Sequence, residues 1–104
     1  MKPTALAIIK EVAEAYGVTT DELRSKSRIA RFADARAVAC YLLHRHTTMS
    51  TTEIGMWLHR DHSSVLHSIR KVEAFNLWPT MYAVDLNIIN NIKQKLFSDA
   101  KTMD

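Results

Sequence analysis

The sequence predicts an all-α protein of about six helices. The whole chain of 104 residues contains only two glycines and two prolines, which leaves little provision for the many turns of a sheet. Good helix formers are well represented, and the proportions of apolar residues (47%) and charged residues (24%) are those of an ordinary globular protein. A chain of this length builds one modest core, so we expect a single domain over residues 1–104.

Periodic apolar positions and capping residues mark the first two helices. Residues 4–16 carry an apolar series at spacings of three and four, and Gly17 follows where a helix would end: Leu6, Ile9, Ala13 and Tyr16. Thr19 and Glu22 form a capping-box pattern, in which each side chain bonds the other residue's backbone N–H. We therefore expect the segment "TTDELRSK" to open a short second helix.

The third helix is expected to begin at Asp34 as its N-cap and to run to about His46, with a broad buried stripe. Ahead of it, the segment "RSKSRIARFADAR", from Arg24 to Arg36, holds five basic residues and a single acid. A charge run of this kind is most often a solvated loop, so it indicates a nucleic-acid contact only beside a second motif.

A helix-turn-helix is predicted in the second half of the chain. Ser50 and Glu53 form another capping box, which opens an eight-residue helix ending near Leu58 and His59. Asp61 is the expected N-cap of a fifth helix almost directly afterwards. A short helix, a turn of three or four residues and a longer helix are the layout whose second helix enters the DNA major groove.

The fifth helix has two contrasting sides. At 100° per residue, Val65, Ile69 and Val72 fall together, with Leu66 at the margin. The opposite side carries short hydroxyl side chains together with a histidine and basic residues: Ser63, Ser64, His67, Arg70 and Lys71. Hydroxyl and imidazole groups reach base edges and basic groups neutralise phosphates, whereas an ordinary surface helix carries paired acids and bases. The pattern alone leaves a DNA-reading helix and a plain polar face both open.

The segment "EIGMWLHRDHSSVLHSIRKV" resembles the signature of the C-terminal DNA-binding domain of the bacterial replication initiator family, DnaA. The match combines residues 53–55, 60–67 and 70–71, with one residue fewer in the turn than many members have. The upstream helices follow the family's order, so the resemblance spans about residues 5–75, and residues 76–104 form an additional C-terminal helix.

This resemblance implies a Trp-repressor-like domain that binds a short duplex element. It places base contacts on the head of the fifth helix and on the basic loop, which would reach the adjacent minor groove: Asp61, His62, Ser63, Arg28 and Arg31. Ala30 occupies the position where the family often has its minor-groove arginine, so we expect Arg28 or Arg31 to take its place. The expected phosphate contacts are Arg36, His44, Arg60, Ser64, His67, Arg70 and Lys71.

Three details bear on the target sequence. His62 falls nearer the core side in a helical projection, and we expect the first turn to splay it outward. Ala35 replaces a family proline, and His59 replaces a turn glycine. These departures affect the DNA sequence that is preferred more than DNA binding itself.

The chain contains no "GxxxxGK[ST]" phosphate loop, so we expect a free-standing module without ATPase activity. Such a module would be a replication-initiator-type or transcription-regulatory protein of a bacterium, phage or mobile element. The single cysteine, Cys40, excludes an internal disulfide and a cysteine-rich zinc module. No apolar run reaches membrane-spanning length and no targeting segment is evident, so we expect a cytoplasmic protein with no membrane partner.

The sequence also contains features that suggest a metal site or an enzyme. The histidine pairs His59/His62 and His44/His46, the second with Cys40 nearby, raise the alternative of a metal site. We expect no metal and no cofactor, because His59 falls in the turn, His62 falls at the helix start, and no set of acids and cysteines converges with them. Ser63 and His67 share a face, as many helix pairs do, and a small helical bundle offers little concave surface, so we expect no enzyme.

The C-terminal helix is the basis of the alternative function. Pro79 is expected in its first turn, and an apolar stripe follows Trp78: Met81, Val84, Ile88, Ile92 and Leu96. We favour a core helix here. The alternative is a surface that pairs with a second copy or with another protein, and the chain would then be a protein-interaction module or a regulator acting through its partner.

Overall fold

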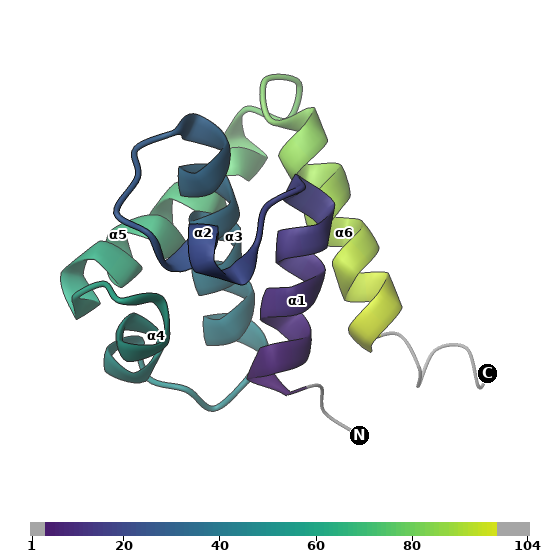
Figure 1. The fold of residues 1–104 in the computed structure, drawn as a ribbon. Coiled ribbons are helices and arrows are strands. Elements are labelled where there is room, and N and C mark those ends of the chain that lie inside the picture. The colour runs from purple at the N-terminus through teal and green to yellow at the C-terminus, as the bar shows by residue number, and fades with distance from the viewer. Residues whose placement is uncertain (1–3, 98–104) are drawn as a thin grey trace.

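The computed structural model describes residues 4–97 and confirms the all-α class. Within these residues the chain forms six α-helices and one short 3₁₀ helix, with no strand (Figure 1). The elements are α1 (Ala5–Tyr16), α2 (Thr20–Arg24), α3 (Ala30–His46), α4 (Thr51–Leu58), α5 (His62–Glu73), η1 (Ala74–Leu77) and α6 (Ala83–Phe97).

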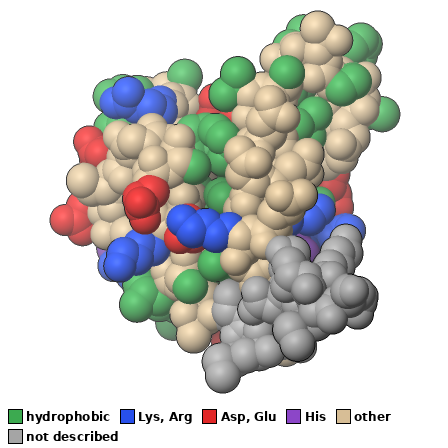
Figure 2. Space-filling model, turned by 90° about the vertical axis from the view of Figure 1, so that its right-hand side faces the viewer, with side chains coloured by type: hydrophobic (Ala, Val, Ile, Leu, Met, Phe, Trp, Pro, Cys, Tyr) green, Lys and Arg blue, Asp and Glu red, His purple; other side chains and the backbone are tan. Residues whose placement is uncertain are grey.

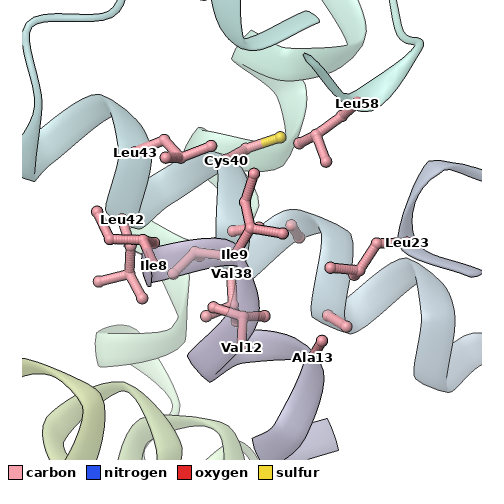
Figure 3. Close-up of a cluster of buried hydrophobic side chains, with 14 of the residues drawn as sticks. Ile8, Ile9, Val12, Ala13, Leu23, Val38, Cys40, Leu42, Leu43 and Leu58 are labelled. Carbon is pink, nitrogen blue, oxygen red and sulfur yellow. The ribbon is translucent and has the colours of Figure 1, made fainter. Parts of the chain in front are cut away.

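Helix α3 is the centre of the molecule. It packs against α1, α2, α4 and α5, with α1 and α6 on one flank and α4 and α5 on the other (Figure 1). Because neighbours surround it, α3 buries apolar residues all around its axis: Phe32, Ala35, Ala37, Val38, Ala39, Cys40, Leu42 and Leu43. Figure 3 shows Val38, Cys40 and Leu42 of this helix among buried side chains from α1, α2 and α4.

The predicted helix starts at Thr19, Ser50 and Asp61 are confirmed. Thr19 and Ser50 each accept from the backbone of the N3 glutamate, whose carboxylate bonds the cap's own N–H in return. Asp61 caps α5. Gly17 ends α1 in the left-handed conformation, with φ of 66°. Of the apolar series in α1, Leu6 is exposed, and the buried positions are Ile8, Ile9, Val12 and Ala13.

The predicted start of α3 was wrong by one turn. The helix begins at Ala30, and its N-cap Ile29 makes no side-chain cap. Phe32 and Ala35 are buried, so packing rather than capping sets this start. Asp34 consequently lies inside the helix, where its carboxylate reaches Lys71 of α5.

The predicted start of α6 was also wrong. Pro79 lies in a turn, and the helix begins at Ala83. The Tyr82 ring stacks on buried Phe75, with centroids 4.3 Å apart, and the Tyr82 amide donates to the Trp78 carbonyl. These contacts hold the segment after η1 in a closed turn, so the first residues after Pro79 do not continue into α6.

Helix α6 packs only along part of its length. Ile89 and Ile92 are buried, and Ile88 and Leu96 are partly buried against the core. Four apolar side chains around the start of the helix are exposed: Leu77, Trp78, Met81 and Val84. In Figure 2 apolar side chains gather at the upper end of this flank. We call these four residues the apolar tip.

Candidate nucleic-acid interface

The turn between α4 and α5 contains only three residues, His59, Arg60 and Asp61. The Arg60 amide donates to the Gly55 carbonyl at 2.8 Å, and a Cβ atom on Gly55 would overlap the Arg60 carbonyl oxygen. Gly55 therefore lets the backbone after α4 fold directly back onto that helix. This close approach positions the start of α5.

His59 provides the left-handed residue that this turn needs. Its φ of 56° and ψ of 43° lie in the region that glycine adopts with least cost. Among the described residues, His59 is the only non-glycine with positive φ. His59 replaces the turn glycine of the family, so the backbone at the centre of the helix-turn-helix is strained.

The first turn of α5 is exposed. Asp61, His62, Ser63 and Ser64 are all exposed side chains. Asp61 Oδ1 accepts from the Ser64 amide at 2.8 Å, and this hydrogen bond holds the pKa of the carboxyl below its usual value. His62 does not turn toward the core, because α5 begins at this residue and its buried stripe starts one turn later, at Val65.

The remainder of α5 has the two sides that its sequence predicted. Val65, Ile69 and Val72 are buried, and Leu66 is 37% exposed at the margin. His67, Arg70 and Lys71 are exposed on the other side. Lys71 Nζ lies 3.2 Å from Asp34 Oδ1, so an acid of α3 partly compensates one end of this basic face.

The loop between α2 and α3, residues 25–29, is structured. The Ser27 amide donates to Ser25 Oγ at 3.3 Å, and the Ile29 amide donates to Ser27 Oγ at 3.2 Å. Lys26 and Arg28 are exposed, as is Arg31 in the first turn of α3. The candidate minor-groove residues Arg28 and Arg31 are therefore both exposed, and the Arg31 guanidinium lies 5.9 Å from the ring centroid of buried Phe32.

Arg36 and Arg60 donate hydrogen bonds to the backbone of this loop. The sequence did not predict these contacts. Arg36 is only 7% exposed; its Nε donates to the Leu23 carbonyl and its Nη2 to the Ser25 carbonyl, both at 2.8 Å. Arg60 Nη2 donates to the same Ser25 carbonyl at 2.7 Å. Burial, and next the nearby Arg60, lower the pKa of Arg36. Arginines in a polar, basic segment give no sequence signal of burial.

A shallow hollow joins the loop to α5. One part lies between α3 and α5, where Arg36 and Cys40 face Ser64, His67 and Lys71. The adjoining part shares Arg36, Arg60 and Ser64 with it and is lined further by Lys26, Ser27 and Arg28. His44 is exposed, one helical turn beyond Cys40 on the same face of α3. The hollow brings together eight of the candidate residues: Arg28, Arg36, Arg60, Asp61, Ser63, Ser64, His67 and Lys71. The other four are exposed but do not line it: Arg31, His44, His62 and Arg70.

Within residues 4–97, no three histidine, cysteine or acidic side chains gather as a metal site requires. No helix in the same range has the length and apolar character to span a membrane.

The three-residue turn, the exposed head of α5 and the adjoining basic surface define a helix-turn-helix protein. The chain belongs to the bacterial DnaA protein helix-turn-helix family, whose model matches residues 6–72. Membership in this family implies DNA binding.

Several chromosomal replication initiator proteins DnaA are similar to this chain. The Deinococcus radiodurans protein is 35% identical over 89 residues, which are 85% of this chain and 19% of that protein. The Lachnoclostridium phytofermentans protein is 42% identical over 67 residues, or 64% of this chain and 15% of that protein. The Geotalea uraniireducens protein is 33% identical over 99 residues, 91% of this chain and 21% of that protein. The chain therefore spans only 15% to 21% of the length of these relatives.

Proposed function

We propose that this chain is a single domain that binds double-stranded DNA in a sequence-specific way, as a replication-initiator-type or transcription-regulatory module in the bacterial cytoplasm. The observation that carries the proposal is the exposed head of α5 beside the structured basic loop, on one continuous surface. A helix end and a neighbouring basic loop are the two elements with which a helix-turn-helix domain reaches adjacent grooves.

In this proposal, the bases are contacted from both elements. His62 and Ser63 project from the first turn of α5 toward the major groove, and Asp61 accepts from a base amino group with the carboxylate that also caps the helix. Arg28 and Arg31 reach the adjacent minor groove.

Phosphate contacts surround the base contacts. Ser64 and the backbone amides at the α5 N-terminus face an anion, because the helix dipole favours negative charge there. His67, Arg70 and Lys71 continue along α5, and Arg36, Arg60 and His44 lie on the facing elements. Contacts of this kind set the affinity and its salt dependence, and carry no base information.

Two single substitutions test these roles. Arg70→Ala should weaken binding to a specific and a scrambled duplex alike, and should lower the slope of log K against log salt by about one unit. Ser63→Ala should leave scrambled binding almost unchanged and weaken binding to the preferred duplex. If both variants lose affinity for the two duplexes equally, α5 does not read bases.

The apolar tip supports a second candidate function. Trp78 is 61% exposed and Met81 is 73% exposed, which is unusual for large apolar side chains in a cluster. A second copy of this chain or another protein would cover such a surface. Sedimentation of the wild type and of Trp78→Ser with Met81→Ser over a concentration series distinguishes self-association, which the substitutions should abolish, from a monomer.

A further inference from the structure

The Ser25 carbonyl oxygen accepts hydrogen bonds from two arginines that belong to different parts of the fold. Arg36 comes from the central helix α3, at 2.8 Å, and Arg60 comes from the turn between α4 and α5, at 2.7 Å. A carbonyl oxygen has two lone pairs, so this single acceptor satisfies both donors. One loop atom is thereby tied at the same time to the core and to the helix-turn-helix.

Further contacts fix the start of the loop. Arg36 Nε donates a hydrogen bond to the carbonyl of Leu23, two residues before Ser25. Arg24 Nε donates to the Trp57 carbonyl of α4 at 2.6 Å, and its guanidinium lies 5.2 Å from the Trp57 ring centroid. The end of α2 is therefore attached to α4 as well, independently of the Ser25 contact.

The backbone of the loop is fixed by hydrogen bonds, whereas its basic side chains are exposed. Lys26 and Arg28 are exposed, whereas the amides of Ser25, Ser27 and Ile29 each have a hydrogen-bond acceptor. Arg60 directly precedes Asp61, the N-cap of α5. The bond from Arg60 thus fixes Ser25, at the start of the loop, relative to the first turn of α5.

We propose that Arg36 and Arg60 are positioning residues for DNA recognition: through the shared Ser25 carbonyl they hold the loop at a set distance from the head of α5, ready to enter neighbouring grooves. This inference rests on the proposed function and adds to any phosphate contact that the two guanidinium groups make. A loop ordered before binding avoids the entropy cost of ordering it in the complex. The two arginines should therefore affect discrimination between DNA sequences without contacting a base.

Arg60→Lys separates positioning from charge. Lysine keeps the positive charge for a phosphate, but its shorter side chain lacks the terminal Nη2 that donates to the Ser25 carbonyl. Arg36→Lys removes the same contact from the α3 side and serves as a second variant. Arg45→Lys is the matched control, because Arg45 is an exposed α3 residue that pairs with Glu73, outside the proposed interface. Thermal melts first establish which variants are folded.

Two readouts are then combined. Amide hydrogen exchange at Ser25, Ser27 and Ile29 measures the loop, and fluorescence anisotropy over a salt series measures affinity for a duplex with an initiator-type box and for a scrambled duplex. In Arg60→Lys, loop exchange should accelerate about tenfold, and affinity for the box should fall about tenfold more than affinity for the scrambled duplex. Arg45→Lys should change neither.

The outcomes are distinguishable. If Arg60→Lys keeps the box preference of the wild type, with or without faster loop exchange, positioning by Arg60 is wrong. If it weakens both duplexes equally, Arg60 acts only as a general contact and the inference is again overturned. If the wild type itself has no box preference, the proposed function fails and the inference fails with it, whatever the loop exchange shows.

Discussion

Asp34 on α3 and Lys71 on α5 form an ion pair, Oδ1 to Nζ, of 3.2 Å at the edge of the proposed DNA-binding surface. Both side chains are partly exposed, at 37% and 40%. In the proposed complex, Asp34 would place a negative charge where phosphate is expected and would compete with DNA for Lys71.

Asp34→Asn should strengthen DNA binding. Freeing Lys71 and removing one acid should raise affinity for a scrambled duplex by about two- to fivefold, and should steepen the salt slope by up to about one unit. Unfolding free energy should change by less than about 1 kcal/mol, because an exposed ion pair contributes little. Glu11→Gln is the matched control: it breaks the Lys95–Glu11 pair on the opposite flank, with the same change in net charge. Equal effects of the two changes would mean that only net charge matters.

Gly55→Ala should disrupt the helix-turn-helix. The added Cβ would overlap the Arg60 carbonyl oxygen, which is backbone and has little freedom to move. We expect a loss of about 1–3 kcal/mol in unfolding free energy, measured with urea. Gly17→Ala is a useful comparison, since no atom lies within 4 Å of its Cβ position and only its φ of 66° opposes alanine. That change should cost about 1 kcal/mol and leave DNA binding intact; a larger cost at Gly17 than at Gly55 would contradict this account.

His59→Gly should stabilise the protein. The substitution removes the steric cost of a left-handed non-glycine residue, and we expect a gain of about 0.5–1 kcal/mol. The same replacement inside a helix, at His67, should instead cost about 0.5 kcal/mol. Denaturant melts of both variants measure the difference. A loss of stability at His59 would mean that its imidazole makes a compensating contact.

Tyr16→Phe should weaken the attachment of α6 without affecting the DNA surface. Tyr16 donates to Asp85 Oδ1 at 2.6 Å, and burial followed by this hydrogen bond raises the pKa of the phenol well above its ordinary value of 10.0. We expect a loss of about 1–2 kcal/mol in unfolding free energy at neutral pH.

The same residue gives a pH dependence with a defined sign. Because the pKa of Tyr16 is higher in the folded state than in the unfolded state, its contribution to stability is complete below pH 10. Above that pH the unfolded chain loses the proton more readily, so the contribution declines as pH rises. Stability of the wild type should therefore fall more steeply above pH 10 than that of Tyr16→Phe, and parallel curves would contradict the raised pKa.

The sequence was informative where local chemistry decides the structure. The capping side chains of Thr19, Ser50 and Asp61 start helices through bonds to residues three positions away, and such short-range patterns are legible in a sequence. The apolar side of α5 could also be predicted, because only one side of this helix meets the core and its residues recur at helical spacing.

Tertiary contacts decided the features that the sequence did not reveal. The start of α3 depends on the burial of Phe32, and the start of α6 depends on the stacking of Tyr82 on Phe75. Arg36 belongs to a segment that looks solvated, yet the carbonyls of Leu23 and Ser25 satisfy it within the fold. Bonds between residues more than ten positions apart leave no periodic signal.

The most direct test of the central claim is a fluorescence-anisotropy titration of the wild type at near-physiological salt, with a duplex carrying an initiator-type box, a scrambled duplex and a single strand. Sequence-specific duplex binding predicts a preference for the box by a factor of about 10³ or more over the scrambled duplex, and weaker binding still to the single strand. Equal, weak binding to all three would contradict base reading by α5 and the loop, and would direct attention to the apolar tip.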